Sequence, residues 1–285
     1  MNSDNRTQPV FSISSLSRSR WNVLDLMQVV GKGSIPTYLL RDVDMTWAEN
    51  LRERLRRNGH RTTVTSILVK AIALAQRAHP ESRTNALPGG RKVTFHNIVA
   101  GLTVEKFVGS EPAIFFGTIK SPDEKSVEEI ATELRAYAER STEDVPQLAL
   151  ENKFTRLPWF LRQVVLWASI NFPWVRLKCN ASTFGLTSLG KFGCQSIFPP
   201  CVNTSTFGVG IVEDRAVVRD GKIVIRPMMT LTLTFDHRII DGAPAARFLH
   251  DVVELLEGGL ERFISAEENI PAAAASCLSQ SARRD

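Results

Sequence analysis

The residues best suited to chemistry lie together at 235–242, with the sequence FDHRIIDG. An alternating apolar run at 229–235 predicts a strand that ends just before His237, and a helix is predicted to begin at Gly242. A histidine at such a junction can keep one ring nitrogen free, and imidazole is the usual general base near neutral pH. Asp241 is expected to fix the loop, and Gly242 to admit a close ligand or backbone. A structural histidine fits the same spacing, so the spacing alone leaves both interpretations open.

The longer stretch 226–257, RPMMTLTLTFDHRIIDGAPAARFLHDVVELLE, resembles the catalytic domain of dihydrolipoamide acyltransferases, the E2 components of 2-oxo acid dehydrogenase complexes. Its DHRIIDG matches the His-x-x-x-Asp-Gly signature of the wider chloramphenicol acetyltransferase-like superfamily. Upstream, TFGLTSLGKFG at 183–193 is similar to a family segment, and 209–227 is similar to the hairpin before the catalytic strand. The likeness covers roughly 14–260 and is most specific toward the C-terminus.

This resemblance implies an acyltransferase and a role for three residues. His237 would remove the proton from the thiol of coenzyme A or dihydrolipoamide, and that thiol would attack a thioester carbonyl. Thr187 would donate a hydrogen bond to the resulting oxyanion. Ser188 is the fallback for that role, because pleating sends it to the other face of the strand. Acyl passes directly between thiols, so the implied mechanism uses no metal and no cysteine.

The resemblance also implies supporting residues and an assembly. Asp241 would hold structure by pairing with an arginine from near the N-terminus, for which Arg18 and Arg20 are the candidates. Gly242 would keep the substrate channel open. The superfamily forms trimers, so we expect a homotrimer or a multiple of trimers in which His237 faces Thr187 of a neighbouring subunit.

Strands interleaved with helices predict a mixed α/β or α+β fold, and the resemblance narrows this to a chloramphenicol acetyltransferase-like mixed sheet flanked by helices. The predicted helices are 14–30, 46–58, 65–78, 126–140 and 242–256. The predicted strands are 37–45, 92–104, 113–120, 183–190, 205–214, 215–227 and 229–235. Thr46 and Glu49 are expected to form a capping box, Asp220-Gly221 a hairpin turn, and 141–155 a polar connection. One catalytic domain at 14–265 is expected, between a flexible tail at 1–13 and a disordered tail at 266–285.

The composition of the 285 residues, 43% hydrophobic and 23% charged, excludes a fully disordered chain, a collagen and a coiled coil. The net charge of +5 suits a phosphate-bearing ligand as well as nucleic acid. No nucleic-acid motif is present, and the basic helix face of Arg52, Arg54, Arg56 and Arg57 is interpreted as solvated because Glu53 interrupts it. Four cysteines without a C-x-x-C pair indicate neither a disulfide framework nor a zinc site. The polar start lacks an apolar signal region, so a cytoplasmic protein is expected.

The sequence departs from the resembled family in two places. It contains no Asp-Lys-Ala lipoyl turn, so we expect a lipoyl group only in trans, on a separate carrier protein. Two alternatives are a transferase that uses a hydroxyl or amine acceptor, and a structural subunit of a dehydrogenase complex without catalysis. The second departure is 156–178, which is rich in Trp and Arg. It is interpreted as a wall for a long or aromatic acyl group, as an interfacial membrane helix, or as a subunit-contact or core helix.

Overall fold

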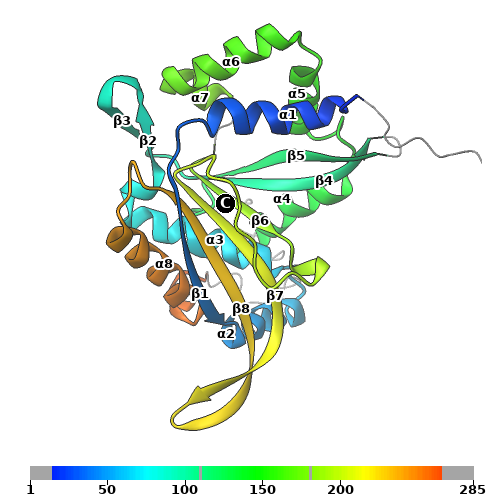
Figure 1. Ribbon diagram of the computed structural model, residues 1–285. Coiled ribbons are helices and arrows are strands. Elements are labelled where there is room, and N and C mark those ends of the chain that lie inside the picture. The colour runs from blue at the N-terminus through cyan, green and yellow to red at the C-terminus, as the bar shows by residue number, and fades with distance from the viewer. Residues whose placement is uncertain (1–14, 109–110, 180–181, 265–285) are drawn as a thin grey trace, which may run out of the picture.

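The computed structural model describes residues 15–108, 111–179 and 182–264. Its centre is a six-stranded mixed sheet in the order β1-β8-β7-β6-β4-β5 (Figure 1). The strands are β1 (Pro36–Asp44), β4 (Val99–Val108), β5 (Glu111–Lys120), β6 (Phe184–Ser188), β7 (Ser205–Arg219) and β8 (Lys222–Asp236). Strand β6 runs parallel to both of its neighbours, and the other pairs are antiparallel. A separate pair is formed by β2 (Thr84–Leu87) and β3 (Arg91–Thr94).

Helices cover the sheet in two groups, which confirms the predicted mixed α/β class. The first group lies on one face and consists of α2 (Thr46–Arg57), α3 (Val64–Ala78), α4 (Val127–Glu139) and α8 (Gly242–Leu256). The second group lies over β4 and β5 and consists of α1 (Arg18–Asp25), α5 (Pro146–Thr155), α6 (Trp159–Asn171) and α7 (Pro173–Lys178). A π-helical turn, η1 (Leu26–Val30), continues α1. The predicted tails 1–13 and 266–285 lie outside the described residues.

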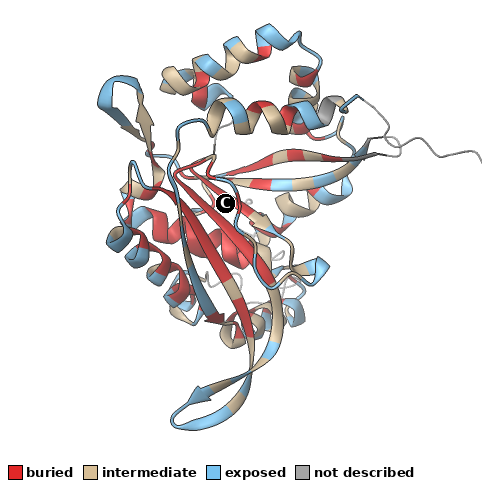
Figure 2. Cartoon of the chain, in the orientation of Figure 1, coloured by how far each residue is buried: buried red, intermediate tan, exposed pale blue. Residues whose placement is uncertain are grey.

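The main core lies between the sheet and helices α3 and α8 (Figure 2). Helix α3 is buried over 66–76, as its continuous apolar sequence predicts. Helix α8 buries a stripe at helical spacing, made of Ala245, Phe248, Leu249, Val252, Val253 and Leu256. These two helices fix the strand end and the helix start that flank His237.

The long hairpin of β7 and β8 turns at Asp220-Gly221, as predicted. Both turn residues have positive φ, +50° and +74°, and a two-residue hairpin turn with this backbone matches the twist of the strands. The tip extends beyond the other strands in Figure 1 and carries exposed apolar side chains, among them Ile223 at 78% exposure. At the end far from the tip, β8 finishes in the core with Asp236, and His237 follows directly.

Four local predictions were wrong. The predicted strands 205–214, 215–227 and 229–235 are only two, because β7 and β8 are continuous on either side of the turn. Helix α2 has no capping box, because Met45 is its N-cap and the Thr46 hydroxyl donates to Asp44 (2.6 Å) instead. The segment 141–155 is not an open connection, because its second half forms α5, with Leu148 buried in a small second core. The predicted strand 92–104 is two strands, because β3 pairs with β2 outside the main sheet and only β4 joins it.

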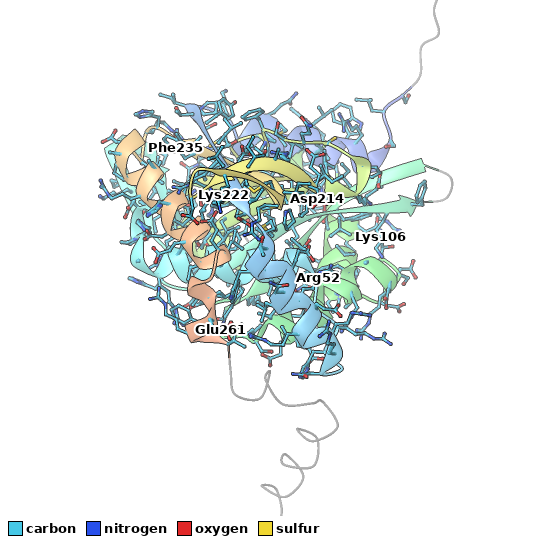
Figure 3. The ribbon with its side chains drawn as sticks, turned by 90° about the horizontal axis from the view of Figure 1, so that it is seen from below. Arg52, Lys106, Asp214, Lys222, Phe235 and Glu261 are labelled. Atoms are coloured by element: carbon cyan, nitrogen blue, oxygen red, sulfur yellow. The ribbon has the colours of Figure 1, made fainter. Side chains whose placement is uncertain are left out.

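The arginines on the basic face of α2 form ion pairs with glutamates of the same chain. Figure 3 views the molecule from this side, with Arg52 on α2 and Glu261 after α8 labelled. Arg54 pairs with Glu261 (2.8 Å), Arg52 pairs with Glu49, and Arg56 pairs with Glu53. These exposed pairs fit the interpretation of a solvated face. Within the described part of the chain, no helix has both the length and the apolar character needed to cross a bilayer.

Candidate active site

His237 lies directly after β8, in the loop before α8, as predicted. Its backbone N–H donates to Ile35 O (2.9 Å), which ties the loop to the residue before β1. Its ring is 42% exposed, and Nδ1 lies 3.7 Å from the Asp241 carboxylate. Among the described residues, no hydrogen bond to Nε2 is present, so this nitrogen is available to accept a proton.

The loop is held by Asp236, which the sequence analysis did not single out. Arg238 donates to both carboxylate oxygens of Asp236, at 3.0 Å from Nε and 2.6 Å from its terminal nitrogen, and Ile35 N donates at 3.2 Å. Burial by itself raises the pKa of Asp236, but the hydrogen bonds from Arg238 and from the backbone outweigh it and the pKa is lowered. The ionised pair fixes the backbone on both sides of His237. In the sequence, an Asp and an Arg directly flank the candidate base. This pattern could have indicated the ion pair.

Of the two arginines predicted as partners of Asp241, only Arg20 has a described side chain, and it does not pair with Asp241. The Asp241 side chain is 85% exposed and contacts His237. Arg20 on α1 forms no ion pair with it in the described structure, and the side chain of Arg18 lies outside the described residues. An added Cβ at Gly242 would meet nothing within 4 Å, so this position is open in the single chain.

Thr187 lies on the wall of a cavity of about 550 Å³ between the sheet and the second group of helices. Side chains two apart in a strand share one face, and several such residues line the cavity. The sheet residues of its lining include Gly101, Thr103, Ile114, Phe116, Thr118, Gly185, Thr187 and Thr206. The Thr187 hydroxyl lies 3.2 Å from that of Thr103. Ser188 is exposed and does not line the cavity, which agrees with the preference for Thr187 over Ser188.

The structure does not bring His237 and Thr187 together within one chain. Thr187 is level with Gly208 of β7, and Gly208 is level with Thr232 of β8. His237 follows Thr232 by five residues, and β6 is two strands from β8. At a rise of about 3.3 Å per residue and a strand spacing of about 4.8 Å, the two residues are roughly 15–20 Å apart. A site that uses both must therefore form between two copies of the chain.

The Trp- and Arg-rich segment 156–178 forms the outer side of the cavity. Val165, Leu166 and Ser169 of α6 line it, which supports the interpretation as a cavity wall. The opposite face of α6 is open, with Trp159 63% and Trp167 57% exposed. The interpretation as a plain core helix was therefore wrong, because only one face of α6 is covered within the chain.

Helix α6 is attached to α1 through a buried acid. Arg162 and Asp25 form an ion pair at 3.1 Å, with side chains only 7% and 2% exposed. Gln163 donates a hydrogen bond to the Asp25 carboxylate at 2.8 Å. Breaking a buried pair by removing one partner is costly, so this contact holds the wall of the cavity in place.

Glu151 of α5 places a carboxyl group in the largely apolar cavity. Burial raises the pKa of Glu151 to about 7, although hydrogen bonds from Phe116 N (2.9 Å) and the Asn22 amide act in the opposite direction. The group is thus partly protonated at neutral pH. Sequence alone gave no indication of this, because a glutamate in a polar stretch is usually solvated.

Replacing Glu151 with glutamine is expected to flatten the pH dependence of stability. The folded-state pKa of about 7 exceeds the ordinary value of 4.5, so the folded protein holds this proton longer than the unfolded chain does. The free energy of unfolding therefore falls as pH rises from 4.5 to 7, by about 3 kcal/mol at most. Glu151→Gln should remove that fall, measured by denaturant unfolding at pH 5 and pH 8. The exposed control Glu143→Gln should keep it, and equal slopes in both variants would contradict the burial of a titrating Glu151.

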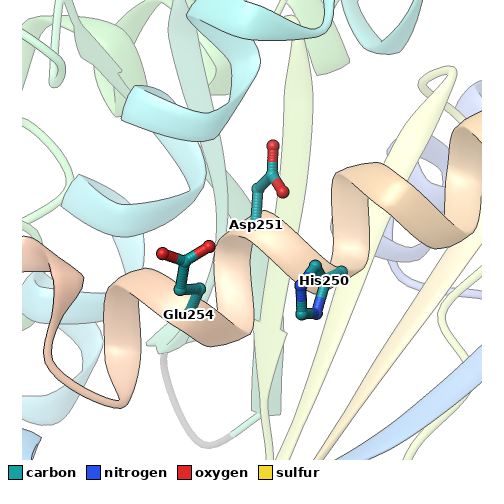
Figure 4. Close-up of side chains that lie close together, drawn as sticks. All are labelled: His250, Asp251 and Glu254. Carbon is teal, nitrogen blue, oxygen red and sulfur yellow. The ribbon is translucent and has the colours of Figure 1, made fainter.

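A cluster of potential metal ligands lies elsewhere, on α8 (Figure 4). Ligand atoms of His250, Asp251 and Glu254 lie within 4.8 Å of one another. Two of these side chains already have partners, because Arg41 contacts His250 Nδ1 (2.9 Å) and His79 contacts the Asp251 carboxylate (2.7 Å). We assign no site to this cluster.

Comparison with known proteins gives matches along most of the chain. The family model described as 2-oxoacid dehydrogenases acyltransferase (catalytic domain) matches residues 11–148 and 178–264. The intervening residues 149–177, hereafter the insertion, are unmatched and contain most of α5, all of α6 and most of α7. The predicted departure from the family at 156–178 is thereby confirmed.

Curated relatives are similar over 76% of this chain. One is the dihydrolipoyllysine-residue succinyltransferase component of the 2-oxoglutarate dehydrogenase complex of Haemophilus influenzae, 26% identical over 224 residues. Another is the lipoamide acyltransferase component of the branched-chain alpha-keto acid dehydrogenase complex of Pseudomonas putida, 28% identical over 226 residues. The match spans 46% of the length of each of these proteins.

Solved structures agree with the fold. The cubic core of the pyruvate dehydrogenase multienzyme complex gives a TM-score of 0.65 at 21% identity, over 90% of this chain and 96% of that one. A probable dihydrolipoamide acetyltransferase from Listeria monocytogenes gives 0.64 at 21% identity, over 87% and 95%. With the family model matched on both sides of the insertion, this chain belongs to the family of 2-oxoacid dehydrogenase acyltransferase catalytic domains.

Proposed function

We propose that this protein is an acyltransferase that moves an acyl group between coenzyme A and a thiol such as dihydrolipoamide. The observation that carries the proposal is a pair of groups at the family's motif positions. One is the imidazole of His237 with Nε2 available, and the other is the hydroxyl of Thr187 on a cavity wall. The imidazole can serve as the general base, and the hydroxyl can stabilise the oxyanion.

The chemistry proceeds by direct transfer between two thiols. His237 takes the proton of the attacking thiol, and the sulfur forms a bond to the thioester carbonyl carbon. The carbonyl oxygen becomes an oxyanion, which accepts a hydrogen bond from Thr187. The intermediate then collapses, the original carbon–sulfur bond breaks, and the leaving thiolate takes the proton back from His237.

The separation of His237 from Thr187 supports an assembly in which each site forms between two chains. We propose a homotrimer or a multiple of trimers, with His237 of one subunit opposite Thr187 of the next, because a cyclic trimer repeats one heterologous contact three times. The lipoyl group would come from outside these 285 residues, since they contain no Asp-Lys-Ala turn. A cytoplasmic location is part of the proposal, because reducing conditions keep a dithiol acceptor free.

A measurement of coenzyme A release tests the proposal. Acyl-CoA is the donor, free thiol is detected after removal of the dithiol, and dihydrolipoamide is compared with hydroxyl and amine acceptors. We expect release that depends on dihydrolipoamide. Release with a hydroxyl or amine instead would assign the alternative acceptor class. An inert protein that binds a dehydrogenase component would support the structural-subunit alternative and contradict acyl transfer.

A further inference from the structure

Arg176 of α7 is a buried arginine without an acidic partner. It is 9% exposed, and its charge is not matched by any carboxylate in the described structure. One terminal nitrogen lies 3.4 Å from the Asn203 side-chain oxygen, and the guanidinium carbon lies 5.8 Å from the ring centre of Phe95. Its Nε has no hydrogen-bond partner. Burying a cation in this way is costly unless an anion is bound there for part of the working cycle.

The position of Arg176 indicates where that anion would come from. Arg176 lines the same 550 Å³ cavity as Thr187. The walls between are largely apolar, with Leu26 and Met27 from η1, Ile114 and Phe116 from β5, and Val165 and Leu166 from α6. A ligand that reaches Arg176 through such walls would have an apolar middle and a charged end.

We propose that Arg176 binds the terminal carboxylate of the acyl group, so that this protein transfers ω-carboxyacyl groups, the half-thioesters of dicarboxylic acids. This rests on the proposed acyl transfer, with the thioester carbonyl beside Thr187 and the carboxylate at Arg176. A guanidinium binds a carboxylate through two parallel hydrogen bonds. Arg176 belongs to the insertion, so the family match does not account for it.

The phosphates of coenzyme A fit Arg176 less well than a carboxylate does. They carry several charges and need water or several cations, whereas Arg176 is a single cation behind apolar walls. Lys178, the other cationic lining residue in the described structure, is exposed and lies over the Trp174 ring. An exposed lysine near the rim suits a phosphate better.

Glu151 lies in the same cavity and carries the opposite charge to Arg176. Taken alone, it would favour an acyl group with a cationic end. Its two carboxyl oxygens are already occupied by Asn22 and by the Phe116 amide. Burial also raises the pKa of Glu151 to about 7, which reduces its negative charge at neutral pH. The group with an unmet interaction is therefore Arg176, not Glu151.

The test compares donors of equal chain length that differ only at the far end. Glutaryl-CoA, pentanoyl-CoA and 5-aminopentanoyl-CoA are assayed with the wild-type protein, with Arg176→Met, and with Arg176→Lys. The wild type should prefer glutaryl-CoA in kcat/KM. Arg176→Met should lose about thirtyfold or more with glutaryl-CoA while keeping its activity with pentanoyl-CoA, and Arg176→Lys should recover part of the loss. Arg156→Met, an exposed arginine of the same insertion, should match the wild type.

Several outcomes would overturn the proposal. One is a wild-type preference for the pentanoyl or aminopentanoyl donor. Another is an equal loss with all donors in Arg176→Met, which would mean a structural role. A third is weaker inhibition by free coenzyme A in Arg176→Met, which would place a phosphate at Arg176.

A binding measurement separates this proposal from the proposed function. Pentanoate and its neutral analogue pentanamide are compared as ligands by thermal stabilisation. Pentanoate alone should stabilise the wild type, and neither should stabilise Arg176→Met. If no donor supports transfer but pentanoate binds through Arg176, acyl transfer fails and the carboxylate site stands. If pentanoate does not bind either, the carboxylate site fails as well.

Discussion

Replacing His237 with alanine is expected to lower kcat for acyl transfer by about a thousandfold while the protein remains folded. The loss follows because the attacking thiol would have no base positioned to take its proton. Stability should change by less than about 1 kcal/mol, because the ring is 42% exposed and its backbone contact to Ile35 remains. The measurement is steady-state coenzyme A release, together with a thermal melt of both proteins.

A matched control separates the role of His237 from a general effect of removing a histidine. His96 is exposed, lies before β4 and does not line the cavity. His96→Ala should keep wild-type kcat. Full activity in folded His237→Ala would remove this residue from the site. A pH profile adds a second readout, because loss of the base should raise the relative rate at high pH, where free thiolate is already present.

The strand-loop-helix unit around His237 could be predicted because its determinants are local. Alternation at 229–235, the turn residues at 220–221 and the helical apolar stripe of α8 each specify an element without tertiary information. The same holds for Thr187 over Ser188, because a strand period of two decides which of them faces the cavity. The family motifs added the chemical roles.

The groups that were missed are those whose role depends on burial in the folded chain. The buried acid of the loop is Asp236, which no pattern singled out, although its partner Arg238 is only two residues away. Glu151 lies in the stretch predicted as a polar connection, and Arg176 lies in the Trp- and Arg-rich segment 156–178. Both line the cavity, which α1, the sheet and the insertion enclose. Burial of a polar side chain is a property of the assembled fold, so periodicity could not reveal it.

Replacing Thr187 with valine is expected to lower kcat by about a hundredfold with little change in KM. Valine keeps the branched shape that packs against Thr103, and only the hydroxyl that would donate to the oxyanion is lost. Thr103→Val removes the neighbouring hydroxyl on the same cavity wall, so it is the matched control and should retain most of the activity. The reverse result, a large loss in Thr103→Val and none in Thr187→Val, would transfer the oxyanion role to Thr103.

The two site variants together test whether each active site is shared between chains. His237→Ala retains Thr187, Thr187→Val retains His237, and the strand register places the two residues roughly 15–20 Å apart within one chain. If neighbours share a site, an equal mixture assembled from unfolded chains should regain about a quarter of wild-type activity, since that fraction of random interfaces has both functional groups. If both groups act within one chain, every site in the mixture carries one defect and activity stays at the level of the variants. Recovery would therefore establish the intersubunit site directly, because no rearrangement within one variant chain can restore the group it lacks.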